Sequence, residues 1–479
     1  MADELWRRLL GETWATLDRE APDDSASGPV WAGGLEVTGD PGQLPSRLPA
    51  EDTAIACAGT ALLAAAALHA GRGGAVLRVL RLDRAHVAAA FRSEAWLRVN
   101  GESSGPGFAP LSRFWPTADG WVRTHANYPW HREALLRALD TSGDPDAVAA
   151  AIAARSACEI EDLVVGARGV AAAVRTEADW RANPAGQAVA AASLVEGRLR
   201  RPAPWDEAFS MAGAPPRRRT AGALPASGIR VLDLTRVIAG PVATRFLAAL
   251  GADVLRLDPP HRPELPQQTY DGLLGKRSAL VDFGTPGGHA RLHELLSGAD
   301  VLVHGYRPRA LDRFGLTPQA LAERHPGLVV VSLSAWGSRG PWGGRRGFDS
   351  IVQAACGIAV AESPDGQRPG ALPCQLLDHG SGYLCAAAVL RALARQASGG
   401  GTLFRELSLA RTGYWLLSQP RSDTEPAAAA DGDPTAWLTT VDSADGRVTV
   451  IRPLGRLDGQ DLAWPSTLTR YGSDPPAWR

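Results

Sequence analysis

Short runs rich in β-branched residues alternate with helical stretches between residues 228 and 337, and this alternation constrains the fold more than any other feature of the sequence. Strands separated by helices are typical of βαβ units around a parallel sheet. We therefore predict an α/β fold class: a parallel, Rossmann-like sheet domain with helices on both faces, plus a smaller α+β domain. The predicted strands are Arg230–Leu234, Asp253–Leu257, Asp300–Val303 and Leu328–Leu333.

A second feature is a layout that occurs twice. A long helical pattern from about Gly380 to Gln396 ends at a glycine cluster and is followed by a strand-like segment, and an alanine-rich run at 54–70 shows the same order. Superposing the two glycine clusters aligns Asp378 with Glu51 without a gap. We interpret this as one degenerate duplication, because it occurs twice and not three or more times. Two unrelated alanine-rich helices remain the alternative.

Four segments follow from these patterns. At 479 residues the chain exceeds the size of one ordinary core, so two or three domains are expected. Residues 1–197 are predicted to hold the degenerate copy and a small α+β domain, whereas 198–227, rich in proline and arginine, are predicted to be a linker. Residues 228–425 are predicted to form the Rossmann-like domain, and 426–479 a C-terminal return segment.

Charge and cysteine content exclude several classes of protein. The net charge is −1, which gives no indication of nucleic acid or of an acidic membrane surface as a partner. Five scattered cysteines without C-x-x-C spacing argue against a disulfide framework or a metal site and indicate a reducing compartment, so we expect a cytoplasmic protein. The alanine-rich run is interpreted as a buried helix, not a membrane span, and no signal peptide is predicted.

The loops after parallel strands are where such a sheet binds its ligand. The first loop, Thr235–Pro241, lacks G-x-G-x-x-G, so a dinucleotide cofactor is unsupported. Two other loops, 274–277 and 306–309, are basic, and clustered guanidinium and ammonium groups suit phosphates. Solvated surface charge is the alternative for each of these loops.

Five ordered segments of the second half resemble one family, the class III coenzyme A transferases, which includes α-methylacyl-CoA racemases and carnitine CoA-transferases. The segments are 228–260, 275–283, 299–316, 332–357 and 376–393. The resemblance implies acyl-CoA and a small carboxylic acid as substrates, no tightly bound cofactor, and an interlocked homodimer. In that family the sheet domain comes first, so the order of the halves is rearranged here. The first half would then cover the active site of the second.

The resemblance also implies roles for individual residues. Asp378 would be the catalytic carboxylate. From their residue types, Trp336, Trp342 and Phe348 are candidates for an apolar acyl pocket, although packing is at least as good an alternative for the tryptophans. Gly380 would leave backbone accessible beside Asp378. The usual Arg-Pro-Gly reads Arg-Pro-Arg at 307–309. The residues implied to line the path of CoA are Val237, Ala239, Arg256, Lys276, Arg277 and Arg307.

The chemistry expected of Asp378 is nucleophilic. A carboxylate can attack a thioester to give a mixed anhydride and a thiolate, which divides one difficult exchange into easier steps. Helix N-terminal amides would stabilise the carboxylate and the developing oxyanion. The alternative role is a helix N-cap. We predict that Glu51, at the matching position, is structural.

Three alternative functions are weighed against CoA transfer. A racemase needs an acid and a base, but the histidine of that branch is replaced by Phe348, and the neighbouring His379 is expected to point elsewhere. A non-catalytic acyl-CoA-binding protein is the second alternative. An oxidoreductase is disfavoured by the missing glycine fingerprint.

Overall fold

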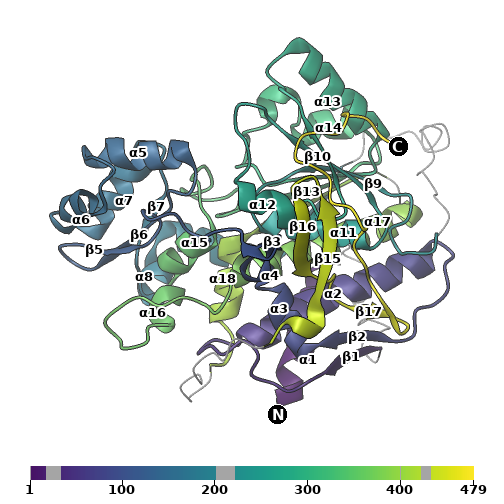
Figure 1. Cartoon of the computed structure of the whole chain (residues 1–479), viewed down its shortest axis with the longest axis horizontal. Coiled ribbons are helices and arrows are strands. Elements are labelled where there is room, and N and C mark those ends of the chain that lie inside the picture. Colours follow the sequence, from purple (N-terminus) through teal and green to yellow (C-terminus); the bar gives the residue numbers. More distant parts are fainter. Residues whose placement is uncertain (1, 18–33, 201–221, 400, 422–432) are drawn as a thin grey trace.

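A seven-stranded sheet forms the centre of the molecule (Figure 1). The computed structural model describes residues 2–17, 34–200, 222–399, 401–421 and 433–479. All strands run parallel except β8, which pairs antiparallel with β14 at one edge. In sheet order the strands are β11 (Arg277–Leu280), β10 (Asp253–Asp258), β9 (Arg230–Leu234), β12 (Val301–His304), β13 (Val329–Ser334), β14 (Thr402–Ser408) and β8 (Glu196–Arg200). The predicted α/β class is confirmed.

Helices cover both faces of this sheet, as predicted. Alternate residues of one strand point to opposite faces, so Val231 of β9 packs with one layer of helices and Leu232 with the other. Helices α11 (Ala239–Ala249) and α17 (Leu376–Gly399) form the first layer, and α13 (Pro286–Gly298) and α14 (Pro318–Arg324) the second. Thr317 caps α14, where a Thr-Pro start was expected. The shorter elements around the sheet are α12 (Pro266–Asp271), η1 (Asp312–Phe314), α15 (Asp349–Cys356), α16 (Ile358–Ala361) and α18 (Leu409–Leu417).

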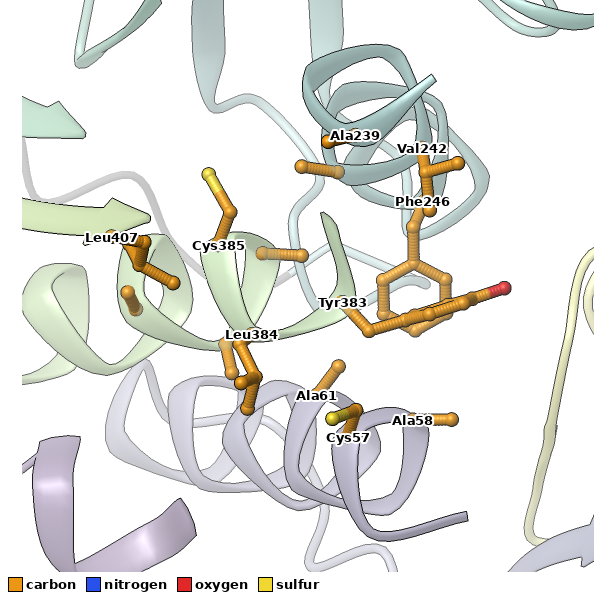
Figure 2. Packing of buried hydrophobic residues seen from close by; sticks show 14 of the residues in the cluster. Cys57, Ala58, Ala61, Ala239, Val242, Phe246, Tyr383, Leu384, Cys385 and Leu407 are labelled. Atoms are coloured by element: carbon orange, nitrogen blue, oxygen red, sulfur yellow. The ribbon is translucent and has the colours of Figure 1, made fainter. Parts of the chain in front are cut away.

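The alanine-rich helix α2 (Ala50–Gly71) packs along α17, so the N-terminal half shares a core with the sheet. Figure 2 shows Cys57 and Ala61 of α2 facing Leu384 of α17, with α11 on the other side. Small side chains let the two helices approach closely. Of the described helices, α2 alone is long and apolar enough to cross a membrane, and 83% of its apolar window is buried inside the protein. The interpretation as a buried helix is confirmed.

The remaining N-terminal elements surround α2. Helix α1 (Ala2–Leu17) packs on α2, and a small mixed sheet joins segments from both ends of the chain. After α2 come a strand and a helix, the order that β14 and α18 also follow after α17. The small sheet comprises β1 (Leu35–Thr38), β2 (Leu80–Asp83), β17 (Arg456–Leu457) and β18 (Gln460–Asp461), followed nearby by α3 (Arg84–Ala90) and α4 (Ser93–Trp96).

A small α+β unit with its own core lies at the left of Figure 1. Its antiparallel sheet consists of β5 (Phe114–Pro116), β6 (Trp121–Thr124) and β7 (Ala171–Ala173), with helices α5 (Pro129–Leu139), α6 (Pro145–Ala153) and α7 (Ala157–Gly166). The next two helices, α8 (Glu177–Ala182) and α9 (Pro184–Ala190), pack in the main core through Trp180 and Val189.

The C-terminal segment returns to the first half. Its hairpin pairs with a short N-terminal hairpin, and the turn expected at 444–446 joins its two strands. The elements are η2 (Thr435–Trp437), β15 (Leu438–Ser443), β16 (Gly446–Ile451), β3 (Arg98–Val99) and β4 (Glu102–Ser103). Residues 198–227 were predicted to be a linker, and this is wrong for residues 198–200. These residues belong to strand β8, which pairs with β14. Residues 201–221 of that linker lie outside the described residues.

Candidate active site

Asp378 is the third residue of α17 and lines a cavity of about 1250 Å³. The residue is only 6% exposed. Among the described residues, no group donates a hydrogen bond to its carboxylate, so it does not act as a helix cap. Burying a carboxylate without a hydrogen-bond partner destabilises the protein, and such groups in native proteins usually have a functional reason.

A second carboxylate, Asp349, fixes the start of α17 from the N-terminus of α15. Its Oδ2 accepts a hydrogen bond from the backbone N–H of Asp378 at 3.0 Å, and the backbone of Leu377 also bonds to it. Asp349 is fully buried and is also bound by the Gln353 amide. Two of the helix N-terminal amides that were expected to stabilise an oxyanion, those of Leu377 and Asp378, are therefore already bonded to Asp349.

Burial and two negative neighbours raise the pKa of Asp378 well above its ordinary value. Burial is the largest cause, followed by the charges of Asp349 and Glu94. Burial also raises the pKa of Asp349 to about 6. A carboxyl with a raised pKa is more basic, and once ionised it is a stronger nucleophile than an exposed aspartate.

His379 points away from the cavity, as expected for the residue next to Asp378. Its ring is fully buried against Phe91, and Nε2 lies 3.0 Å from Oε2 of Glu94 on α4. His379 is not among the residues that line the cavity. The N-terminal half thus supplies the partner of the side chain adjacent to Asp378.

The cavity opens at the carboxyl ends of β9, β12 and β13. The strand order reverses beside β9, because β10 follows on one side and β12 on the other, and such a switch point is the usual binding crevice of an open parallel sheet. Val237, at φ 68°, and Ala239 line it. Six arginines also line it: Arg236, Arg262, Arg307, Arg313, Arg345 and Arg346.

Three predicted CoA-path residues lie elsewhere. Arg256, Lys276 and Arg277 are absent from the cavity lining, and acidic groups of the sheet domain hold each of them. Arg256 is bound by Asp258 at 2.6 Å and by Glu264 at 2.8 Å. Lys276 Nζ lies 2.9 Å from Asp233, and Arg277 lies 2.8 Å from Asp253. A cation already neutralised inside the protein is not available to a phosphate.

Of the residues predicted for the acyl pocket, some line the cavity and others do not. Phe348 lines the cavity, whereas Trp336 does not: it packs on Trp342 at 4.8 Å between ring centroids and donates its indole N–H to the backbone of Arg346. Gly380 faces α2, where an added Cβ would meet Cys57 Sγ at 3.4 Å. The prediction that its backbone would be accessible beside Asp378 is therefore wrong, because Gly380 does not line the cavity.

Sequence reasoning missed one wall of the cavity. Tyr128, Trp130 and His131, at the start of α5 in the first half, line it beside loops of the sheet domain. Their signal was present as a dense aromatic run at 128–131, but nothing in the spacing showed which surface it would face.

Glu51 is the residue of α2 that aligns with Asp378, and its carboxylate, unlike that of Asp378, is hydrogen-bonded. Its Oε2 accepts hydrogen bonds from the backbone N–H groups of Gly42, Gln43 and Leu44, and Oε1 accepts one from Arg84 at 2.6 Å. These four bonds occupy the carboxylate. The geometry agrees with the structural role that the sequence predicted for Glu51.

Among the described residues, no group of three or more His, Cys, Asp or Glu side chains is arranged to hold a metal ion.

Comparisons with known proteins find relatives of the second half of the chain. Residues 226–450 match the family described as CoA-transferase family III. The chain is 35% identical over 192 residues to the probable fatty acyl-CoA transferase Rv3272 of Mycobacterium tuberculosis, covering 37% of this chain and 48% of that protein. It is 36% identical over 177 residues to a formyl-CoA:oxalate CoA-transferase of Streptomyces coelicolor, covering 35% and 43%.

A crystal structure of Rv3272 aligns with 41% of this chain and 57% of that one, at 32% identity and a TM-score of 0.39. The chain thus spans about half the length of the relatives it matches. The predicted resemblance to class III CoA-transferases is confirmed.

Proposed function

We propose that this chain, whose residues 226–450 match CoA-transferase family III, moves coenzyme A from an acyl-CoA donor to a carboxylic acid acceptor, with Asp378 as the acyl carrier. The observation that carries the proposal is the state of Asp378. It is buried, lines the large cavity, and has no hydrogen bond to its carboxylate among the described residues.

The proposed reaction begins with attack by a carboxylate oxygen of Asp378 on the thioester carbonyl. The new C–O bond gives a mixed anhydride, and the broken C–S bond releases CoA thiolate. The thiolate then attacks the aspartyl carbonyl, which frees the donor acid and leaves an aspartyl-CoA thioester. The acceptor carboxylate attacks that thioester and displaces the thiolate again. Attack of the thiolate on the acceptor's acyl carbon yields the new acyl-CoA and regenerates Asp378.

The cavity wall suits the substrate. Coenzyme A carries several phosphate charges, and guanidinium groups bind phosphate oxygens through paired N–H donors. Arg307 donates only to the backbone of Gly344, at 2.8 Å, and Arg313 contacts the ring of Phe314. Both arginines line the cavity, and neither guanidinium is hydrogen-bonded to a carboxylate among the described residues.

The alternatives have less support. A protein that only binds acyl-CoA gives no reason to bury Asp378 without a partner, and a racemase would need an acid–base group where Phe348 stands. The cytoplasmic location, the homodimer and the absence of a tightly bound cofactor remain predictions.

The test compares Asp378→Asn with Glu51→Gln. Each protein is incubated with a panel of acyl-CoAs and free acids, exchange is followed by chromatography, and the acyl adduct is trapped with hydroxylamine and located by mass spectrometry. We expect D378N to bind CoA but to lose exchange by about a thousandfold or more, since it removes the nucleophile. E51Q should exchange normally and melt at a lower temperature.

Two outcomes would overturn the proposal. One is full exchange by D378N. The other is CoA binding by the wild-type protein with neither exchange nor an adduct across the panel, which would favour a binding protein.

A further inference from the structure

His131 is a buried, titratable side chain of the cavity wall that the proposed reaction does not use. It lies in the first turn of α5, is 5% exposed, and lines the cavity together with Asp378. Its ring packs against Tyr128 at 5.5 Å and Phe348 at 5.7 Å between ring centroids. These contacts hold the imidazole in place in the cavity wall.

Neither ring nitrogen of His131 has a hydrogen-bond partner among the described residues, and Nδ1 is fully buried. A buried polar atom without a partner is destabilising, and in native proteins such atoms usually have a functional reason. Nε2 is not among the fully buried atoms without a partner, so it is the nitrogen that a ligand in the cavity can reach. A hydrogen bond from Nε2–H to that ligand would leave Nδ1 as the unprotonated nitrogen.

The imidazole is neutral at ordinary pH. Burial, followed by the positive charges of Arg346, Arg262 and Arg236, lowers the pKa of His131 to about 3. A neutral imidazole offers one N–H donor and one acceptor nitrogen. His131 is therefore an uncharged hydrogen-bonding group surrounded by positively charged arginines.

Two of those arginines are free of acidic partners. Arg346 donates to the backbone of Arg168 at 3.1 Å, and Arg262 stacks on Trp130 at 4.7 Å; neither forms an ion pair with a carboxylate among the described residues. A carboxylate of a ligand would bind more favourably than an alkyl chain beside guanidinium groups that lack acidic partners and a neutral N–H donor.

We infer that His131 is a specificity-determining residue that donates a hydrogen bond to a second carboxylate of the substrate. The preferred acids would then be short dicarboxylic acids, not monocarboxylic acids of the same size. The inference rests on the proposed function, because it places an acyl group at Asp378 with its far end toward His131. The first half of the chain would thus choose the acid on which the second half acts.

The experiment measures the binding of three ligands by calorimetry: CoA, succinyl-CoA and 4-methylpentanoyl-CoA, in which an isopropyl group replaces the far carboxylate. All proteins carry Asp378→Asn to prevent turnover. We expect the parent to prefer succinyl-CoA, and His131→Phe to reduce that preference about ten- to hundredfold, the usual effect of a hydrogen bond to a charged group. Affinity for CoA itself should stay the same.

Two further variants separate binding from folding. His131→Gln keeps an N–H donor and should recover part of the preference. His125→Phe is the matched control: His125 is equally buried and also has an unpartnered Nδ1, but it does not line the cavity. It should leave the preference unchanged. Because His131 is neutral, the preference should stay constant between pH 6 and 8, whereas a charged imidazole would lose it as the pH rises.

The outcomes distinguish the two proposals. If CoA binds but the parent shows no preference, or if H131F keeps it, the inference about His131 falls and CoA transfer stands. If H131F lowers affinity for all three ligands alike, His131 is only structural. If no CoA species binds the parent, both proposals fall.

Discussion

Replacing Asp349 by asparagine should make CoA transfer tolerate lower pH. The hydrogen bond of 3.0 Å from the Asp378 backbone to Asp349 places the two carboxylates on the order of 6 Å apart. At an effective dielectric constant of about 20, two unit charges at that distance repel by about 3 kcal/mol, or about two pKa units. Asparagine removes the charge and still accepts the backbone N–H, so the pKa of Asp378 should fall.

The sign follows from the role of Asp378. The reaction needs its ionised form, so activity rises with pH through its pKa, and a lower pKa moves that rise to lower pH. The assay is kcat/KM for acyl exchange between pH 4 and 9, which reports the ionisation of the free enzyme. We expect the acidic limb to shift down by about one to two pH units.

An exposed aspartate gives the control. Asp365 is bound by the backbone N–H groups of Gln367 and Arg368 and does not line the cavity, so Asp365→Asn should leave the profile unmoved. If Asp349→Asn left the acidic limb in place or moved it to higher pH, the electrostatic coupling between Asp349 and Asp378 would be refuted.

Two further predictions concern the core. Lys276→Met leaves Asp233 buried without its ion-pair partner, so urea denaturation should show a loss of about 3–5 kcal/mol, while the Kd for CoA should stay within about twofold because Lys276 does not line the cavity. Ala61→Leu overpacks the fully buried contact between α2 and α17 and should cost about 1–3 kcal/mol. Because the two helices share one core, A61L should unfold in a single transition by circular dichroism and tryptophan fluorescence; separate transitions would show that the halves fold independently.

Periodic patterns predicted most of the fold. The four expected strands are β9, β10, β12 and β13, each within about one residue, because β-branched residues between helices have few other arrangements. The helix expected from about Gly380 to Gln396 is α17, which begins four residues earlier, at Leu376. The short strand β8 was missed, since Glu196–Arg200 carries no alternation of its own and is a strand only because β14 has a free edge.

The site was predicted less completely, and basic residues show why. Arg307 lies in the cavity wall, whereas Arg256 and Lys276 do not. All three lie near strand ends in a basic context, but Arg256 faces Asp258 and Glu264 inside the sheet domain. Sequence spacing gives the position of a cation along the chain. It does not show whether a distant carboxylate neutralises it.

The two halves need each other to form the proposed site. Helix α17 carries Asp378, and the fully buried Leu384 faces α2, so residues 226–450 alone would expose an apolar helix face to water. They would also lose Glu94, the partner of His379, and the wall that bears His131. A protein truncated to the family-matching region should therefore aggregate or lack exchange, even though it keeps Asp378. In the N-terminal half, the carboxylate of Glu51 is fully hydrogen-bonded and is not available as a nucleophile. That half instead supplies the packing that keeps Asp378 buried and its pKa raised.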